Sequence, residues 1–425
     1  MSVLNTEFLR AFGKSKAETA LVQSVTAGML LNAGFPCGQF VNKFGVRKMG
    51  ICAGFLASIG LILSFLATSI PYLITSVGVV TGFGLSLGFV SITTSVGEHF
   101  HGKARFVALS FVSSGSGCGA MVFPFLLDYL IKMYGWRGCL LIVGGLMANM
   151  ICFTAICKPP SPSIQQNFPR LLVNDDINSS QQTPHNQQIV CSYENKTFTV
   201  NNTSYVTPNQ EHSFIAKLKV LTGNYTFILF IVAVCCTLPA YDATLIYLIE
   251  FLKTKSFADK DALLLYFFMN VGNTTGRLVP GLCKHIPHMG ALIIPALFTS
   301  LSCLSVVGLL EASSYYQHVL LMCCFGVSMG GNVTVLSMTT MKLVGLANYS
   351  VGVGILMTLV GLCCMCSGAI SGGLFDITGS YMASFYGVAA CHGVAVFLYI
   401  IAASMRKYKA ANTKEYPSSA NGELL

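Results

Sequence analysis

Apolar runs long enough to cross a lipid bilayer recur along most of this chain. A membrane-spanning helix needs about 20 mostly apolar residues, and eleven runs of about this length are bounded by charges or turn residues. They cover Ala20–Phe40, Met49–Thr68, Tyr72–Val96, Val107–Leu130, Gly138–Cys157, Tyr225–Ile249, Leu263–Cys283, Ala291–Leu310, Val319–Met341, Val351–Phe375 and Met382–Ser404. The runs predict an all-α membrane protein.

The composition agrees with a chain that is dissolved in lipid. Hydrophobic residues make up 53% and charged residues 10% of the chain, whereas about a quarter of the residues in a soluble protein are charged. The net charge of +9 is spread in short clusters between the apolar runs, so we expect no nucleic-acid binding. Most of the 17 cysteines lie inside apolar runs without zinc-ligand spacing, and we expect no metal and no cofactor.

One polar stretch divides the runs into five and six. Residues 158–217 are rich in Pro, Gln, Asn and Ser, which predicts a disordered linker. The expected domains are an N-terminal helical bundle (1–157), the linker (158–217), a C-terminal six-helix bundle (218–405) and a tail (406–425). Glycosylation sequons at Asn178, Asn195, Asn201 and Asn202 fall in the linker, and glycans there would contradict a cytoplasmic linker.

The distribution of basic residues sets the expected orientation, because short cytoplasmic loops carry an excess of Lys and Arg. Loops on one side hold Lys43, Arg47, Lys48, Lys103, Arg105, Lys284, Lys342, Arg406, Lys407 and Lys409. This places the linker and the C-terminus in the cytoplasm. Met1–Lys16 lacks the apolar core of a signal peptide and is expected to be a loop. Eleven spans with a cytoplasmic C-terminus would place this basic N-terminal segment outside the cell, against the charge bias. A twelfth helix before Met1 would remove that conflict, so we expect that this sequence lacks a first helix.

Two glycines and several cations mark the loop after the first run. The segment Gly38–Lys48 resembles the loop signature of the major facilitator superfamily, with Gly38 and Gly45 allowing a tight turn and Arg47 near helix ends. Asn42 stands where the signature has an acid. Ordinary positive-inside charge would explain the cations but not the glycine spacing.

The segment from His99 to Gly115 resembles the fifth-helix signature of the monocarboxylate transporter family. The matching residues are Phe100, Lys103, Arg105, Ala108 and Gly115, whereas His99 and Ala104 depart from it. The segment Tyr134–Gly138 resembles the entry to the family's sixth helix, and Gly372–Tyr381 resembles the turn between its last two helices. The family's Trp-rich opening motif is absent. The resemblance implies a major facilitator fold of two pseudo-symmetric bundles, with a substrate site between them near the bilayer midplane.

The segment Gly272–Gly281 carries the most informative charge. An arginine at the centre of a membrane helix costs about 2.5–3.5 kcal/mol on insertion scales, so Arg277 needs a partner or a wet cavity. The resemblance implies that Arg277 contacts the substrate carboxylate. It also implies an acid four residues earlier, where this chain has Asn273, which leaves proton coupling open. Arg277 could instead extend to the cytoplasmic surface.

A second charge within an apolar run is Asp242, three residues after Pro239. It could pair with Arg277 or with a substrate amine, or it could lie near the external surface. The spacings Gly84–Gly88, Gly115–Gly119 and Gly368–Gly372 predict close helix packing.

The sequence therefore favours a transporter, proton-linked or facilitative, of small monocarboxylates, related organic anions or aromatic amino acids, working by alternating access. The alternative is a non-transporting sensor or an inactive truncated paralogue. An enzyme is not expected, because the runs hold too few titratable groups. The resemblance also implies a plasma-membrane location and a single-pass immunoglobulin-type companion.

Overall fold

The structure is a computed structural model that describes residues 2–100, 102–157, 219–282, 291–345 and 348–415. No strand occurs in these ranges, so the all-α prediction is confirmed. The first half contains α1 (Ser2–Phe12), α2 (Lys16–Asn32), α3 (Gly34–Phe44), α4 (Val46–Leu63), α5 (Ile70–Leu73), α6 (Gly82–His99) and α7 (Gly102–Ile156), with a 3-10 turn at Ser64–Leu66 and a π-helix at Ile74–Thr81. The second half contains α10 (Tyr225–Thr254), α11 (Asp259–Leu282), α12 (Ile293–Glu311), α13 (Tyr315–Val344), α14 (Tyr349–Thr378) and α15 (Tyr381–Glu415).

The predicted apolar runs coincide with these helices. Among the described residues, eight segments are long and apolar enough to cross a membrane. One of them is α7, which bends at Gly135 (φ 68°, ψ 172°) and so holds two predicted runs. The α2–α3 pair and α11 are not among these eight segments. The helix α2 is too short to cross a membrane alone, and α2 and α11 both carry polar side chains.

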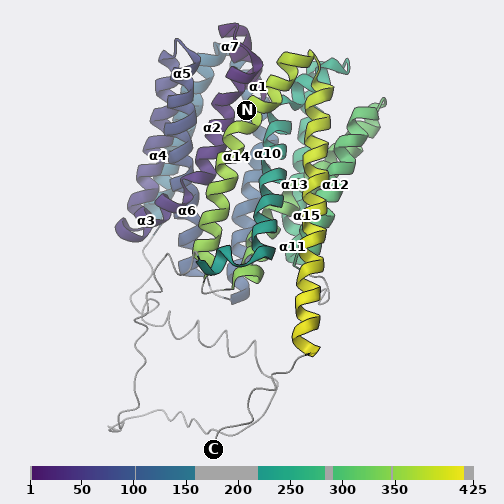
Figure 1. The fold of residues 1–425 in the computed structure, drawn as a ribbon. Coiled ribbons are helices and arrows are strands. Elements are labelled where there is room, and N and C mark those ends of the chain that lie inside the picture. Colours follow the sequence, from purple (N-terminus) through teal and green to yellow (C-terminus); the bar gives the residue numbers. More distant parts are fainter. Residues whose placement is uncertain (1, 101, 158–218, 283–290, 346–347, 416–425) are drawn as a thin grey trace, which may run out of the picture. The chain divides into compact units, whose positions relative to one another are not determined.

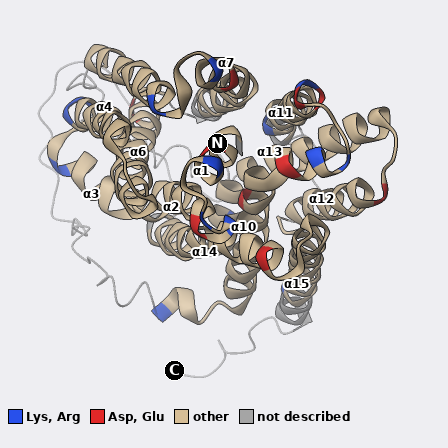
Figure 2. Cartoon of the chain, turned by 90° about the horizontal axis from the view of Figure 1, so that it is seen from above, with Lys and Arg blue, Asp and Glu red and all other residues tan. Residues whose placement is uncertain are grey.

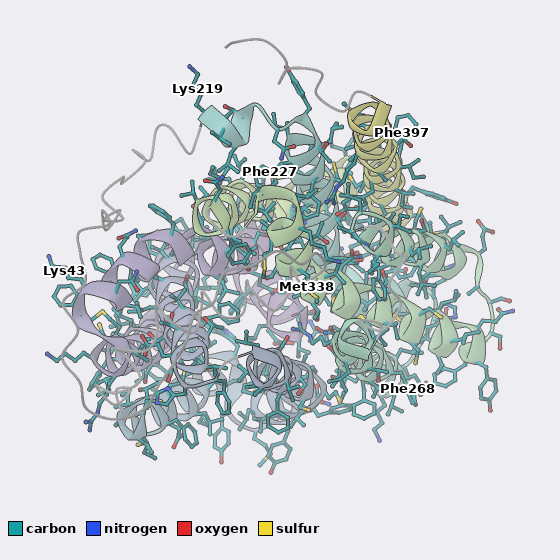
Figure 3. All side chains as sticks on the ribbon, turned by 90° about the horizontal axis from the view of Figure 1, so that it is seen from below. Lys43, Lys219, Phe227, Phe268, Met338 and Phe397 are labelled. Carbon is teal, nitrogen blue, oxygen red and sulfur yellow. The ribbon has the colours of Figure 1, made fainter. Side chains whose placement is uncertain are left out.

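The described helices on both sides of residues 158–218 form one compact unit. We call the end where α7 finishes and α10 begins the linker side, and the opposite end the far side (Figure 1). Large apolar side chains remain exposed along the helices; Phe397 on α15 is 64% exposed, whereas Phe227 on α10 is 1% exposed (Figure 3). Exposed aromatic residues at this density suit a helix surface in contact with lipid.

The N-terminal segment is helical, so its prediction as a loop is wrong. Leu4 and Phe8 of α1 are buried, 5% and 1% exposed. The Phe8 and Phe12 rings lie 5.5 and 5.7 Å from the Trp136 ring. Apolar residues at i, i+4 and i+8 share one helix face, and their aromatic partner lies in a distant part of the sequence. Figure 2 shows α1 in the middle of the far side, where it contacts α2, α7 and α10.

The two halves meet along α2 and α14, which pack closely because glycines face each other. A Cβ on Gly28 would lie 2.6 Å from the Gly361 carbonyl oxygen, and one on Gly361 would lie 2.8 Å from the Gly28 oxygen. Gly368 and Gly372 pack against Ser24 and Ala17 of α2, which confirms the packing predicted for that glycine pair. Small residues allow helix backbones to approach in this way.

The other predicted glycine pairs have different outcomes. Gly84 packs against Ala57 of α4 and Gly88 against Met150 of α7, as the spacing predicts. A Cβ added to Gly115 or Gly119 would meet no atom within 4 Å, so the packing prediction for this pair is wrong. Gly117, which lies between them on α7, packs against Thr274 instead.

The loop signature after the first run is a turn between α3 and α4. Gly45 has φ +88°, a conformation that L side chains rarely adopt, and it separates the two helices. Gly38 lies within α3 with open space around it, so only Gly45 has the predicted role. Asn42 and Arg47 are exposed at this turn, and no hydrogen bond to a helix end is found for either among the described residues.

Candidate functional site

Arg277 is held inside the bundle by contacts from two helices. Its Nε donates to Asn273 Oδ1 at 3.2 Å, one turn back along α11, and its Nη1 donates to Ser113 Oγ of α7 at 2.7 Å. Both bonds direct the guanidinium away from the linker-side end of α11. The expected alternative, in which the side chain extends to the surface, does not describe this conformation.

The backbone beneath Arg277 is fixed by crossed glycine contacts between α11 and α13. A Cβ on Gly272 would collide with the carbonyl oxygen of Cys323, and one on Gly276 with that of Val327. In the reverse direction, a Cβ on Gly326 would collide with the Met269 carbonyl. Gly272–Gly276 and Gly326–Gly330 are therefore paired small-residue motifs, and Arg277 follows the first directly. Their spacing is visible in the sequence, but it does not reveal that the two motifs face each other.

Asn273 is buried, 3% exposed, between Arg277 and α13. A Cβ on Gly330 would lie 2.9 Å from Asn273 Oδ1, so the amide rests against the bare backbone at that glycine. An amide oxygen accepts the guanidinium hydrogen bond but carries no charge. Arg277 therefore has two neutral partners among the described residues, and these use two of its five N–H donors.

Ser113 is a site residue that the sequence did not single out. It lies in the small-residue stretch of α7, two positions before Gly115. Gly117, one turn further along α7, packs against Thr274 of α11, where a Cβ on the glycine would lie 3.1 Å from the Thr274 Cβ. The close approach of α7 and α11 brings Ser113 within reach of Arg277, across 164 positions of sequence. The side chains of Lys103 and Arg105, at the start of α7, lie outside the described residues.

Asp242 lies apart from Arg277 and has a different partner. Its Oδ2 accepts a 2.6 Å hydrogen bond from Ser367 Oγ of α14. Among the described residues four salt bridges occur, and neither Asp242 nor Arg277 takes part in them. The structure thus brings Arg277 and Asn273 together and leaves Asp242 at the α10–α14 contact.

A second polar group, which we call the far-side cluster, joins the two halves at the end of the bundle opposite the linker side. It consists of Thr6, Lys16, Glu250, Tyr381 and Asp376. Lys16 Nζ lies 3.4 Å from Glu250 Oε2, with side-chain exposures of 18% and 10%. The Tyr381 hydroxyl bonds to both Lys16 and Glu250, and Thr6 Oγ1 donates to Glu250 Oε1 at 3.3 Å. Figure 2 shows charges of both signs meeting near α1 and α10.

Lys16 has aromatic and backbone partners as well. Its ammonium lies 3.4 Å from the Phe375 ring centroid and 4.1 Å from that of Tyr381, within the range of cation–π attraction. The Asp376 carboxylate accepts from the backbone N–H groups of Lys16 and Ala17, at 3.4 and 3.2 Å. A carboxylate at this position satisfies free N–H groups at the start of α2 and complements the helix dipole.

The described helices form a bundle of membrane-spanning length in which α2 and α14 join the two halves. A sequence model of the Major Facilitator Superfamily matches residues 1–367, and the chain belongs to that superfamily. Its curated relatives include monocarboxylate transporters 9, 12 and 14, which confirms the family that the motifs predict.

Three of these relatives show how the similarity is distributed. Monocarboxylate transporter 9 of Rattus norvegicus is 37% identical over 177 residues, which cover 42% of this chain and 34% of that protein. Monocarboxylate transporter 14 of Mus musculus is 24% identical over 94% of this chain and 85% of its own length. Monocarboxylate transporter 12 of Xenopus laevis is 28% identical over 91% of this chain and 80% of its own. The match with the first therefore spans about a third of that relative.

Solved structures support the same fold. A mutant of the nucleoside transporter NupG aligns with a TM-score of 0.65 at 14% identity, over 95% of this chain and 94% of that one. A bacterial homologue of the human lysosomal transporter Spinster aligns with a TM-score of 0.62 at 13% identity, over 95% and 91%. At this identity the likeness shows the fold alone.

Proposed function

We propose that this chain transports a small monocarboxylate, a related organic anion or an aromatic amino acid by alternating access, and that Arg277 binds the carboxylate. The observation that carries the proposal is the guanidinium of Arg277, held between the halves by Asn273 and Ser113, with no carboxylate among its described partners. A planar guanidinium binds a carboxylate with two parallel hydrogen bonds. The names of the curated relatives point to the same substrate class.

Asn273 affects the coupling of transport to protons. A carboxylate at this position would neutralise Arg277 and could carry a proton, whereas an amide does neither. Because the Arg277–Asn273 pair carries no proton, we expect facilitative transport. The substrate itself supplies the negative charge that faces Arg277.

Alternating access requires the bundle to close at each end in turn. The far-side cluster provides the contacts that hold the far side closed. Lys16 belongs to the first half and Glu250 and Tyr381 to the second, so separation of the halves at this end breaks the contacts of Lys16 with both. Since the contacts exist only while the far side is closed, they stabilise that state over the opposite one. On the proposed topology the far side is extracellular and the linker side is cytoplasmic.

The alternative is a membrane sensor that binds the same substrates without moving them. The neutral Asn273 favours it, because loss of the acid removes a group that a proton-driven carrier would use. Substrate-dependent thermal stabilisation of the purified chain without any uptake into proteoliposomes would favour the sensor over the carrier.

Uptake of labelled lactate, pyruvate and aromatic amino acids into proteoliposomes tests the transport proposal. Arg277→Lys keeps the charge but loses the planar fork, and Arg277→Ala loses both. Loss of one or two charge-assisted hydrogen bonds, about 1.5–3 kcal/mol each, predicts at least a tenfold fall in apparent affinity for both variants. Thr275→Ala changes an exposed residue of the same helix and serves as the control. If uptake by Arg277→Ala equals that of the control, Arg277 does not bind the substrate.

A further inference from the structure

An apolar groove lies between the linker-side end of α12 and the middle of α15. Its volume is about 300 Å³, and its walls include Leu292, which precedes α12, Ala296, Leu297 and Ser300 of α12, and Tyr399, Ile400 and Ala403 of α15. An apolar cavity of about 150 Å³ already binds a molecule as large as benzene. The groove is distinct from the site around Arg277, because none of its walls comes from α7 or α11.

The two helices that line this groove also contact each other beyond it. Cys303, three residues beyond the last groove residue of α12, donates from its Sγ to the Ala389 carbonyl of α15 at 3.4 Å. Tyr399 forms the floor, 2% exposed, with its ring 6.1 Å from that of Phe230. Leu297 and Ile400 on the rims are each 55% exposed, so the groove opens towards the lipid.

The groove walls suit a hydrocarbon chain. None of the wall residues is charged. The hydroxyl of Ser300 is occupied by a 2.8 Å hydrogen bond to the Ala296 carbonyl of its own helix. Burying an alkyl chain there leaves no wall hydroxyl of α12 without its partner.

The mouth of the groove carries positive charge. Arg406 lies one turn beyond Ala403 on α15, and its Nη2 donates to the Lys342 carbonyl of α13 at 3.3 Å. One turn before Lys342, Thr339 Oγ1 donates to the Ala291 carbonyl at 3.1 Å, next to the groove wall at Leu292. Both cationic side chains are exposed. Where side chains are described at this end of the second half, no carboxylate accompanies them.

We propose that this groove binds one anionic phospholipid, with an acyl chain between α12 and α15 and the phosphate at Arg406 and Lys342. The apolar walls suit the acyl chain, and the two cations suit the anionic headgroup. One phospholipid molecule therefore matches both parts of the site. Guanidinium and ammonium groups at a membrane surface attract anionic lipids. On the proposed topology the lipid belongs to the cytoplasmic leaflet, but the binding itself does not depend on that topology or on transport.

Native mass spectrometry of the purified full chain tests the proposal, with phosphatidylglycerol and phosphatidylcholine of identical acyl chains as probes. At about 1 kcal/mol for each cation near the headgroup, replacing both Lys342 and Arg406 by Gln should weaken phosphatidylglycerol binding roughly 30-fold. Phosphatidylcholine binding should hardly change. Lys43→Gln removes an exposed lysine at the linker side of the first half, and it should have no effect.

A second set of variants tests the groove itself. Ala403→Phe and Ala296→Leu fill it from opposite walls and leave both cations in place, so either one should lower the binding of both lipids. The proposal would be overturned if the protein bound the two lipids with equal affinity, or if Lys43→Gln lost as much phosphatidylglycerol binding as the double Lys342 and Arg406 variant. Unchanged lipid binding in both groove-filling variants would also overturn it. Glycerol phosphate, which lacks acyl chains, should not bind measurably; binding as strong as that of the lipid would show a surface cation patch instead.

Discussion

The ion pair between Lys16 and Glu250 allows a quantitative test of the far-side contact. The perturbations are Lys16→Met, which keeps most of the apolar stem, Glu250→Gln, and the double variant. At the 3.4 Å separation and an effective dielectric constant of about 20, the Coulomb attraction is about 5 kcal/mol. Most of it is offset by the desolvation of two groups with side-chain exposures of 18% and 10%.

The net coupling expected from this pair is therefore about 2 kcal/mol, in the range of charged hydrogen bonds in proteins. Each factor of ten in an equilibrium costs about 1.4 kcal/mol, so Lys16→Met should raise the open fraction of the far side about 30-fold. This variant also loses the attraction of the ammonium to the Phe375 ring. Glu250→Gln should have a smaller effect, because the amide can still bond to Thr6 and Tyr381, the other partners of Glu250.

Hydrogen–deuterium exchange with mass spectrometry measures this opening locally. Exchange should accelerate in peptides from the start of α2 and the end of α14, because local opening exposes their backbone amides. Lys132→Met is the matched control: Lys132 and Asp128 form a shorter ion pair, 2.6 Å, but within one helix and with exposures of 64% and 29%. Equal exchange in Lys16→Met and Lys132→Met, or a coupling near zero in the double-variant cycle, would refute the reasoning.

Other variants test the contacts around Arg277 and the glycines that position it. Asn273→Asp should make uptake rise as the external pH falls, because the new carboxylate takes up a proton, and an unchanged pH profile in proteoliposomes would contradict this. Gly117→Ala should lower the melting temperature and the uptake rate, since its Cβ meets Thr274 and overpacking costs about 1–3 kcal/mol; Gly115→Ala, in open space on the same helix, should change neither. Gly326→Ala should be more destabilising still, because its Cβ meets backbone rather than a side chain; thermal unfolding should show a clear loss relative to Gly393→Ala, where no atom lies within 4 Å.

The sequence predicted the helices well because hydropathy and turn residues are local properties. Gly135 and Gly45 mark breaks at which the backbone has positive φ; Gly45 lies in a predicted turn and Gly135 in a predicted entry to a helix. The failure at α1 has the opposite cause. Leu4 and Phe8 are too few to suggest a buried helix face until Trp136, far along the chain, is brought beside Phe8.

Of the candidate site, the sequence predicted only the contacts that lie within a single helix. Arg277 and Asn273 are four residues apart on α11, so their contact follows from helix geometry. Ser113 could not be assigned, because its role depends on how α7 and α11 cross. The same limit applies to glycine spacing: Gly368 and Gly372 pack and Gly115 does not, although both pairs share one spacing. Which face meets a neighbour is a tertiary property.

The crossed glycine contacts of α11 and α13 have a consequence for the position of Arg277. Because Arg277 follows Gly276 directly, the backbone position from which its side chain starts is fixed by the contact of Gly276 with the Val327 backbone. Asn273 and Ser113 orient the guanidinium through their hydrogen bonds, but they do not set this backbone position. On the proposed function, the attachment point of the anion is therefore fixed by the backbone contacts of α11 and α13, separately from the side chains that orient the guanidinium.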